Sequence, residues 1–276
     1  MPTNQANLEF WNTNYDWPAG GDEWSSAWGG AETQWHGTIL PRIQHHLPVH
    51  TILEIAPGFG RWTQFLASLC ERLIVVDLSS KCIDACRARF RDSTHIDYHV
   101  NDGLTLPFIG DRSVDFVFSF DSLVHVEADV IESYVNELGR VLKPGGRGFI
   151  HHSNLAEQSE RSLLHKFLPS HHRLHALARR TGLIPQTHGR GQSVSASVFR
   201  CYAEKAGVSC ISQEKVNWGG KHTIDCLSSI QKSPTPMQRA VATLNNPHFM
   251  READYLAQLS TLYGRRGAGL LKRREG

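Results

Sequence analysis

The chain has 276 residues, of which 40% are hydrophobic and 20% are charged. A chain of this length and composition folds around one large core and is not an intrinsically disordered protein. Its net charge of +2 at pH 7 argues against a strong electrostatic attraction to nucleic acids or anionic membranes.

The first 50 residues are rich in tryptophan and glycine. Five of the seven tryptophans lie here, at positions 11, 17, 24, 28 and 35, and two glycine pairs separate them. The glycines predict loops, followed by a helix over 31–47 in which Pro41 indicates a break or a bend. We expect the tryptophan-rich segment to close over a ligand site as a lid. The alternative is that its tryptophans only pack the segment onto the rest of the domain.

From residue 51 onward, short apolar strands alternate with helical segments. The predicted strands cover 51–56, 72–77, 95–100, 113–120 and 147–152, and the predicted helices cover 61–70, 80–90 and 127–142. Ser79 or Ser80 is expected to cap the second of these helices. Such alternation predicts a parallel sheet with helices on both faces.

The chain beyond residue 153 changes in character. The stretch 154–194 is polar, rich in His and Arg, and has no strand signal. A helix at 195–206 precedes two strands, 208–218 and 221–231, which flank a glycine pair and predict an antiparallel hairpin at the sheet edge. A last helix is expected at 247–263, and the basic tail after it is interpreted as a solvated end.

A glycine turn and three acidic residues follow the first three predicted strands. The segment LEIAPGFG (53–60) places Gly58 and Gly60 directly after a buried strand, where glycine permits a sharp turn and the close approach of a ligand. Glu54 lies in that strand, and Asp77 and Asp102 follow the next two. Any one of these acids alone would be explained as the cap of a turn. Together with the glycine turn they predict a ligand site at the carboxyl ends of the strands.

A nicotinamide dehydrogenase is the main rival interpretation of this turn. Its fingerprint requires a small third residue and a helix N-terminus that is free to bind pyrophosphate. Here Gly58 and Gly60 are followed by Arg61, Trp62 and Thr63, so the start of the helix is bulky. This pattern favours a cofactor without pyrophosphate.

The E-x-x-x-G-x-G turn, Asp77, the Asp102–Gly103 pair, the segment DFVFSFDSLVHV and the closing hairpin together resemble class I S-adenosylmethionine-dependent methyltransferases. The resemblance covers about residues 50–231. It implies a Rossmann-like α/β fold with a seven-stranded, mostly parallel sheet whose last strand is antiparallel. It also implies S-adenosylmethionine as the cofactor, S-adenosylhomocysteine as the product, and a site across the carboxyl ends of the strands.

The resemblance also implies roles for particular residues. Glu54, Gly58 and Gly60 are expected at the methionine part of the cofactor, Asp77 at the ribose and Asp102 at the adenine. The full set expected at the cofactor is Glu54, Ala56, Gly58, Gly60, Trp62, Asp77, Leu78, Asp102, Gly103 and Phe120. Ala56 replaces a glycine that is common in the family, and we expect an altered turn rather than lost binding.

The whole chain is interpreted as one methyltransferase domain. Its expected parts are an N-terminal lid and helix (1–50), a cofactor-binding core (51–153), a substrate-side insertion (154–194), a helix and hairpin (195–231) and a C-terminal helix with a tail (232–276).

Methyl transfer from a sulfonium is an in-line displacement, so the enzyme must align the acceptor and accept its proton. The candidate groups follow the fourth and fifth strands. They are His125 and His152 as bases and Asp121 as a residue that orients a histidine. Because residues alternate along a strand, at most one of His151 and His152 is expected to point into the site. No cluster of carboxylates at metal-ligand spacing is present in the sequence, and no metal is predicted.

The acceptor is expected to be a small molecule. The segment Ser119–Ser122 lacks the Asn/Asp-Pro-Pro-aromatic motif of methyltransferases that act on nucleic-acid bases, and no basic stripe is present. The resemblance to bacterial polysaccharide and natural-product methyltransferases implies a hydroxyl of a sugar or glycosylated metabolite. N-methylation of a small amine is the alternative. A catalytically idle cofactor-binding regulatory protein is an alternative of another class.

A cytoplasmic location is predicted from what the sequence lacks. No apolar run approaches the ~18 residues of a membrane span, and the start MPTNQANLEF lacks the features of a signal peptide. The six cysteines are scattered without a C-x-x-C pair, as in a reduced protein. The sequence predicts no membrane or nucleic-acid partner and leaves the oligomeric state open.

Overall fold

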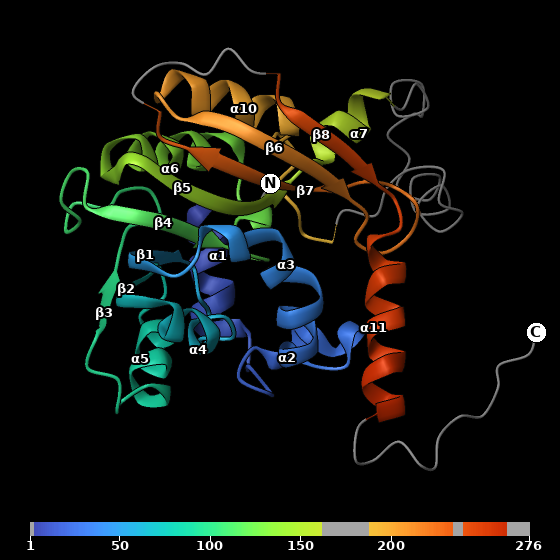
Figure 1. Ribbon diagram of the computed structural model, residues 1–276, viewed down its shortest axis with the longest axis horizontal. Coiled ribbons are helices and arrows are strands. Elements are labelled where there is room, and N and C mark those ends of the chain that lie inside the picture. Colours follow the sequence, from blue (N-terminus) through green and yellow to red (C-terminus); the bar gives the residue numbers. More distant parts are fainter. Residues whose placement is uncertain (1–2, 162–187, 234–239, 264–276) are drawn as a thin grey trace, which may run out of the picture.

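One mixed sheet forms the centre of the protein in the computed structural model, which describes residues 3–161, 188–233 and 240–263 (Figure 1). The strand order is β3-β2-β1-β4-β5-β7-β6-β8. The strands are β1 (Val49–Ile55), β2 (Cys70–Asp77), β3 (Ile96–Val100), β4 (Val114–Ser119), β5 (Leu142–Ser153), β6 (Ser209–Val216), β7 (Asp225–Gln231) and β8 (Ala242–Asn246). β1 to β5 pair in parallel, and β7 runs antiparallel to both β5 and β6.

The parallel core and the antiparallel hairpin confirm the predicted fold class, but the expected count of seven strands is wrong. An eighth strand, β8, pairs in parallel with β6 and displaces the hairpin from the sheet edge. Its sequence ATLNN is short, and four of its five residues are exposed, so it carries no pattern of alternating burial. Main-chain hydrogen bonds to β6 hold it in the sheet, and the order of apolar and polar side chains in the sequence does not predict such bonds.

The predicted strand at 147–152 is also longer than expected. β5 begins at Leu142 and includes Pro144 and the glycine pair after it, which lie before the predicted start at residue 147. A register shift between Val114 and Phe116 of β4 accompanies this start. A bulge of this kind accommodates residues that cannot keep a regular hydrogen-bond ladder.

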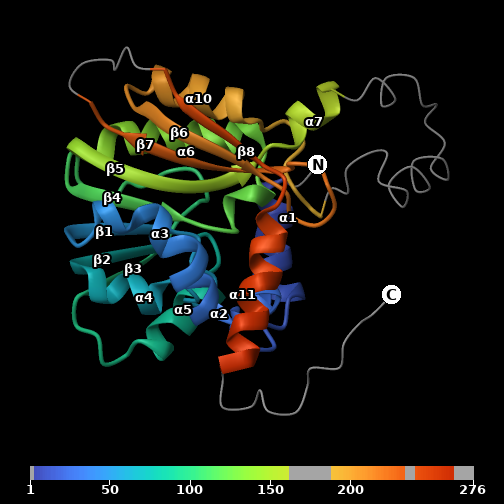
Figure 2. The ribbon, with the colours of Figure 1, turned by 45° about the vertical axis from the view of Figure 1, so that its right-hand side comes forward.

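The helices cover both faces of the sheet. α6 (Ala128–Val141) and α10 (Ala196–Lys205) pack on one face, shown above the sheet in Figure 1. The other face is covered by α2 (Ala31–Gln34), α3 (Leu40–Ile43), α4 (Thr63–Leu66), α5 (Ser80–Arg89) and α11 (Phe249–Tyr263). α1 (Asn4–Glu9) lies near the start of the described chain, and α7 (Leu155–Arg161) follows β5 (Figure 2). The predicted cap of α5 is Ser79, whose hydroxyl accepts the N–H of Cys82.

Pro41 bends the predicted helix at 31–47 through a π-helical turn. The turn covers Trp35–Ile39 and separates α2 from α3, and the N–H of Leu40 bonds to the carbonyl of Trp35. Proline has no N–H to continue the ordinary ladder, so the chain widens before it.

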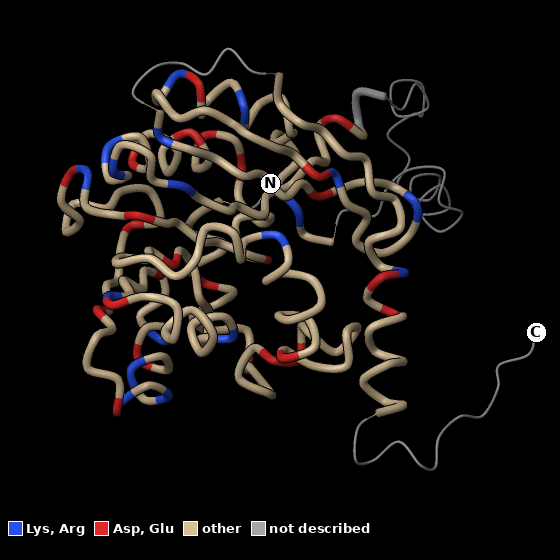
Figure 3. The backbone as a smooth tube through the Cα atoms, viewed as in Figure 1, with Lys and Arg blue, Asp and Glu red and all other residues tan. Residues whose placement is uncertain are grey.

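Lys and Arg residues are interspersed with Asp and Glu residues over the described chain (Figure 3), in line with the small net charge. Within the residues that the structure describes, no helix has the length and hydropathy needed to cross a membrane.

Candidate active site

A cavity of about 520 Å³ lies at the carboxyl ends of the parallel strands. Its floor is the turn after β1, the end of β2 and the loop after β4. Its walls are the N-terminal segment, residues 188–190 and Trp218. A volume of this size is typical of a small-molecule or cofactor site.

The turn after β1 adopts left-handed backbone conformations. Ala56 has φ +56° and Gly58 has φ +58°, and both line the cavity. A Cβ atom on Gly58 would lie 2.7 Å from the ring of Trp17, so only glycine fits below that ring. Ala56 adopts the conformation at a cost of about 1–2 kcal/mol. Gly60 faces Phe90 and Cys86 instead of the cavity.

Asp77 lies at the end of β2 and borders the cavity. Its carboxylate accepts the N–H of Ser79 at 2.9 Å on one oxygen and the N–H of Gly58 at 3.3 Å on the other. Burial raises its pKa to about 6. Each oxygen has a second lone pair, so the carboxylate can also accept two hydroxyl groups, as a ribose requires.

Glu54 and Trp62 lie behind the cavity and do not line it. Glu54 is fully buried, accepts the hydroxyl of Thr63 at 2.6 Å, and has one oxygen without a hydrogen-bond partner. Burial raises its pKa to about 8. Trp62 packs beside Trp35 and Phe120 in the core. The structure therefore brings neither residue to the place expected for a direct contact with the cofactor.

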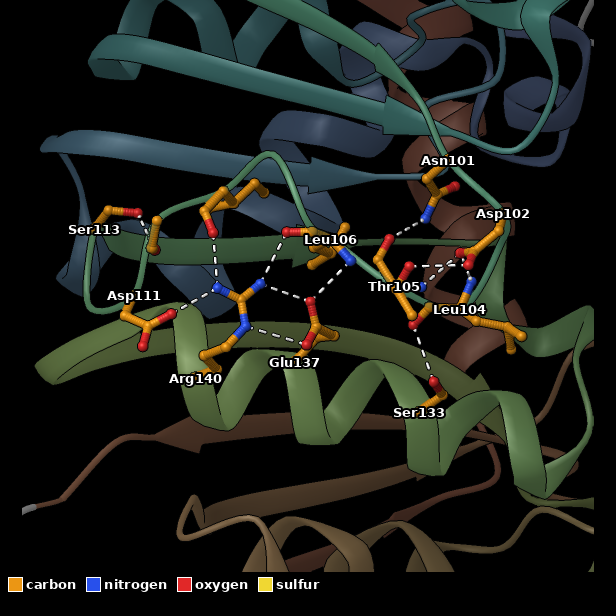
Figure 4. Close-up of polar contacts among 12 residues, drawn as sticks. Asn101, Asp102, Leu104, Thr105, Leu106, Asp111, Ser113, Ser133, Glu137 and Arg140 are labelled. Carbon is orange, nitrogen blue, oxygen red and sulfur yellow. Dashed lines mark hydrogen bonds and ion pairs between the residues drawn. The ribbon is translucent and has the colours of Figure 1, made fainter.

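The carboxylate of Asp102 turns back onto its own loop (Figure 4). It accepts the N–H groups of Leu104 and Thr105 at 2.8 and 2.6 Å and the Thr105 hydroxyl at 2.9 Å. Arg140 braces the same loop through the carbonyls of Leu106 and Ile109. Asp102 does not line the cavity, whereas its neighbour Gly103 and Leu78 do.

The N-terminal segment covers the cavity with aromatic rings. Trp11, Trp17 and Trp24 line it, and the ring of Trp17 stacks on Phe59 at 4.4 Å. Phe10 also lines the cavity and is 45% exposed, so aromatic surface continues to the mouth. We call this cavity-lining segment, residues 3–24, the lid below; its closing over a ligand remains a prediction.

Three asparagines attach this lid to strand ends. Asn4 donates to the carbonyl of Gly103 at 3.4 Å, and Asn7 donates to the carbonyl of His125 at 3.0 Å. The side-chain oxygen of Asn12 accepts the Ser79 hydroxyl at 2.9 Å. The lid therefore touches both the β2–β3 side and the β4 side of the cavity.

Asp121 begins the loop after β4 in a left-handed conformation, with φ +63°. Its carboxylate pairs with Arg61 at 2.9 Å, and its N–H donates to Nδ1 of His151 at 3.1 Å. Asp121 and the preceding Phe120 both line the cavity. Arg61 also contacts the hydroxyl of Ser25, at 3.3 Å.

His125 lines the cavity and has a defined tautomer. Its Nδ1 lies 3.1 Å from the carbonyl oxygen of Gly189, which can only accept, so Nδ1 carries the proton and Nε2 keeps its lone pair. Burial and the nearby Arg190 lower the pKa of His125 below its usual value. The imidazole is therefore neutral at pH 7 and can act as a base.

His151 and His152 lie on opposite faces of β5, as alternation predicted, and neither lines the cavity. His152 stacks on Phe199 at 4.3 Å, and its Nε2 lies 2.8 Å from the hydroxyl of Ser228. Burial lowers its pKa to about 4. His152 is packed beneath α10, so the structure does not support it as a base. His151 packs against Phe120, which does line the cavity.

The sequence analysis missed a second buried ion pair beside the cavity. Arg190 lines the wall and binds both carboxylate oxygens of Asp225, at 3.1 and 2.9 Å. Trp218 packs against His151 at 5.3 Å and lines the same wall. The sequence feature that could have revealed this pair is Asp225, a charged residue at the start of the buried strand β7. A charge in a buried strand needs a partner of opposite charge.

Comparisons with known proteins agree with this geometry. A family model described as "Methyltransferase domain" matches residues 52–146. The chain is 36% identical over 112 residues to the biotin biosynthesis bifunctional protein BioHC of Cellvibrio japonicus, covering 41% of this chain and 21% of that protein. It is 28% identical over 126 residues to nodulation protein S of Sinorhizobium fredii, covering 45% and 57%.

The fold is similar to that of N-methyltransferase NodS from Bradyrhizobium japonicum WM9, solved in complex with S-adenosylhomocysteine. The TM-score is 0.52 at 18% identity, with 85% of this chain and 100% of that chain covered. The chain spans 21% and 57% of the length of the two curated relatives named above.

The sheet order, the glycine turn and Asp77 define a Rossmann-like cofactor-binding fold. Residues 52–146 match a methyltransferase domain model, and the described chain has the Rossmann-like fold of methyltransferases of known structure.

Proposed function

We propose that the protein transfers the methyl group of S-adenosylmethionine to a hydroxyl group of a small acceptor, a sugar or a glycosylated metabolite. The observation that supports this most is the neutral, oriented imidazole of His125 in the cavity wall. A hydroxyl is a very weak acid, so its methylation benefits from a base that accepts the proton.

The residues on the β1–β2 side fit the cofactor. We assign the ribose to Asp77, and the methionine part to the turn at Ala56 and Gly58, where the backbone lines the cavity. We assign the adenine to the neighbourhood of Leu78 and Gly103. When bound, S-adenosylmethionine supplies an electrophilic methyl group on a positively charged sulfur.

The residues on the β4 side would act on the acceptor. The walls would position its oxygen and exclude water, and Nε2 of His125 would accept the hydroxyl proton. The sulfonium would give up its methyl group and become a neutral thioether, and the released acceptor proton would reside on the imidazole. Asn7 and Gly189 hold the histidine on both sides.

The charge of the walls favours an acceptor without a strong charge. Arg61 is paired with Asp121, and Arg190 is paired with Asp225. Aromatic rings from Phe10, Trp11 and Trp24 make up the lid, and such rings suit sugar rings and apolar rings.

N-methylation of a small amine is the second candidate. It is favoured by the similarity to NodS, which is named an N-methyltransferase. An amine that is already neutral at the working pH needs positioning more than a base, so the two candidates differ in how strongly they depend on His125.

The test is a methyl-transfer assay with labelled S-adenosylmethionine and a panel of glycosides and small amines. His125→Asn keeps a donor toward Gly189 and removes the base, so kcat should fall about 10²-fold or more. Affinity for S-adenosylhomocysteine should stay within about threefold. Wild-type kcat should rise with pH through an apparent pKa below that of free histidine and then level off, because the base must be neutral.

His152→Gln is the matched control and should retain activity, since that side chain faces α10. If His125→Asn keeps kcat within about threefold of wild type, the histidine is not the base and N-methylation by positioning is favoured. Cofactor binding without transfer to any compound of the panel would instead favour a cofactor-binding regulatory protein.

A further inference from the structure

Asp225, the first residue of β7, is a fully buried carboxylate that lies outside the cavity. It binds the guanidinium of Arg190 through both oxygens, and one oxygen lies 3.4 Å from Nε2 of His151. These contacts hold its pKa well below the usual range despite the burial. A buried ion pair stabilises a fold only weakly compared with apolar packing, so its presence beside a site points to a positioning role.

One connection runs from Asp225 through Arg190 to the tautomer of His125. Arg190 lies between Gly189, whose carbonyl accepts Nδ1–H of His125, and Gly191, whose N–H donates to the carbonyl of Val124 at 2.8 Å. A Cβ on Gly191 would lie 1.9 Å from the carbonyl oxygen of Val126, so this segment is pressed directly against the loop of His125. Fixing Arg190 therefore fixes the carbonyl that orients the imidazole.

The second connection runs through His151 to the start of the same loop. Nδ1 of His151 accepts the N–H of Asp121, so the ring proton is on Nε2, which faces Asp225. The accepted N–H holds Asp121 in its left-handed conformation. His125 follows four residues later in the chain, so the angle at which the loop leaves β4 affects where the imidazole lies.

We propose that Asp225 is a positioning residue that orients His125 from both sides, through Arg190 and through His151. The inference rests on the proposed role of His125 in methyl transfer. It adds that this role depends on a carboxylate of β7 that touches neither the cavity nor His125.

The charged groups that act on His125 come from three elements. Arg190 lies on the segment before α10, Asp121 on the loop after β4, and Asp225 on β7. From the N-terminal lid, His125 is contacted by Asn7 and Trp11, neither of which titrates. Arg190 lowers the pKa of His125, while Asp121 and Asp225 raise it. Loss of the Asp225 charge alone therefore lowers that pKa, and loss of Arg190 together with Asp225 raises it.

The experiment is side-chain ¹⁵N NMR of the full chain with labelled histidine, recorded with and without S-adenosylhomocysteine across a pH titration. His125 is assigned by the loss of its signals in His125→Asn. In the wild type we expect the Nδ1–H tautomer alone. In Asp225→Asn we expect signals of mixed tautomers and a lower pKa for His125, with affinity for S-adenosylhomocysteine within about threefold of wild type.

A second variant keeps the test possible if Asp225→Asn does not fold. Arg190→Met with Asp225→Leu removes both buried charges and keeps similar volumes, which is often tolerated. It should also mix the tautomers, but with a pKa above that of Asp225→Asn. Asp115→Asn is the matched control, because Asp115 accepts from Lys143 and from the Thr51 N–H at a separate pocket near the amino ends of the strands.

The proposal is overturned if His125 keeps one tautomer in the folded Asp225 variants, or if Asp115→Asn disturbs it equally. Failure of the methyl-transfer assay would overturn the proposed function. The effect of Asp225 on the His125 tautomer could still be measured, because the NMR experiment needs no acceptor.

Discussion

One half of the cavity is lined mainly by backbone, and the other half is lined mainly by side chains. The half beside β1 and β2 consists mainly of backbone turns and the Asp77 carboxylate from residues 56–103, with Trp17 and Asn4 of the lid over them. The half beside β4, β5 and β7 consists largely of side chains from segments far apart in the sequence, and the pairs Arg61–Asp121 and Arg190–Asp225 hold two of its arginines. Backbone can present the same groups under many sequences, whereas a side-chain wall changes with each substitution. A fixed cofactor suits the first half, and an acceptor that differs among relatives suits the second.

Deletion of residues 1–24 should have the largest effect, because the lid contacts both halves. Without Asn7 and the tryptophans, water enters the site and the loop of His125 loses a support. We expect turnover to fall about 10²-fold or more, since small misplacements have effects of that size. Affinity for S-adenosylhomocysteine should fall less, although Asn12 also contacts the β2 side. Steady-state rates and calorimetry check this, with thermal unfolding as the control for folding. Full activity in the truncated protein would contradict the lid.

Glu54 provides a test of the β1–β2 half that depends on pH. Its pKa is raised by burial to about 8, above that of an exposed glutamate, so the folded protein holds a proton that the unfolded chain has released. Stability contributed by this group is therefore lost as pH rises from about 4.5 to about 8. Glu54→Gln removes that loss, and its advantage over wild type should grow by roughly 4 kcal/mol across this window.

The measurement is denaturant unfolding of both proteins at several pH values. Glu137→Gln is the control of opposite sign, because Arg140 lowers the pKa of Glu137. Its stabilising charge is present throughout this range and is lost only in acid, so this variant should be less stable than wild type by a constant amount. A pH-independent difference for Glu54→Gln would show that the carboxyl does not titrate in this window.

The difference between the halves also decides what the sequence could predict. Local sequence patterns predict the glycine turn, Asp77 and the first five strands. Strand burial and turn conformation depend on residues that are neighbours in the sequence. The pair Arg190–Asp225 joins residues 35 positions apart, and no local pattern connects them. β8 was missed because a strand held by main-chain bonds needs no apolar alternation.

The two histidines at the end of β5 show most clearly what a sequence pattern cannot predict. Alternation predicted opposite faces for His151 and His152, but it could not say which face opens to the cavity. The structure packs His152 against Phe199 of α10 and leaves His151 beside Phe120 and Trp218. Similarly, the position of Asp102 after β3 was predicted, but not that its oxygens bind their own loop.

The most direct measurement of the central claim is calorimetric binding of S-adenosylhomocysteine to wild type, Asp77→Ala and Asp102→Ala. We predict binding to the wild type and none of NAD. Loss of the Asp77 acceptor should weaken affinity by about 1.5–3 kcal/mol, or roughly 10- to 150-fold, as expected for a hydrogen bond to a charged group. Asp102→Ala should change it by less than about threefold, because that carboxylate lies outside the cavity. Tight binding of NAD, or an unchanged affinity in a folded Asp77→Ala variant, would contradict the account.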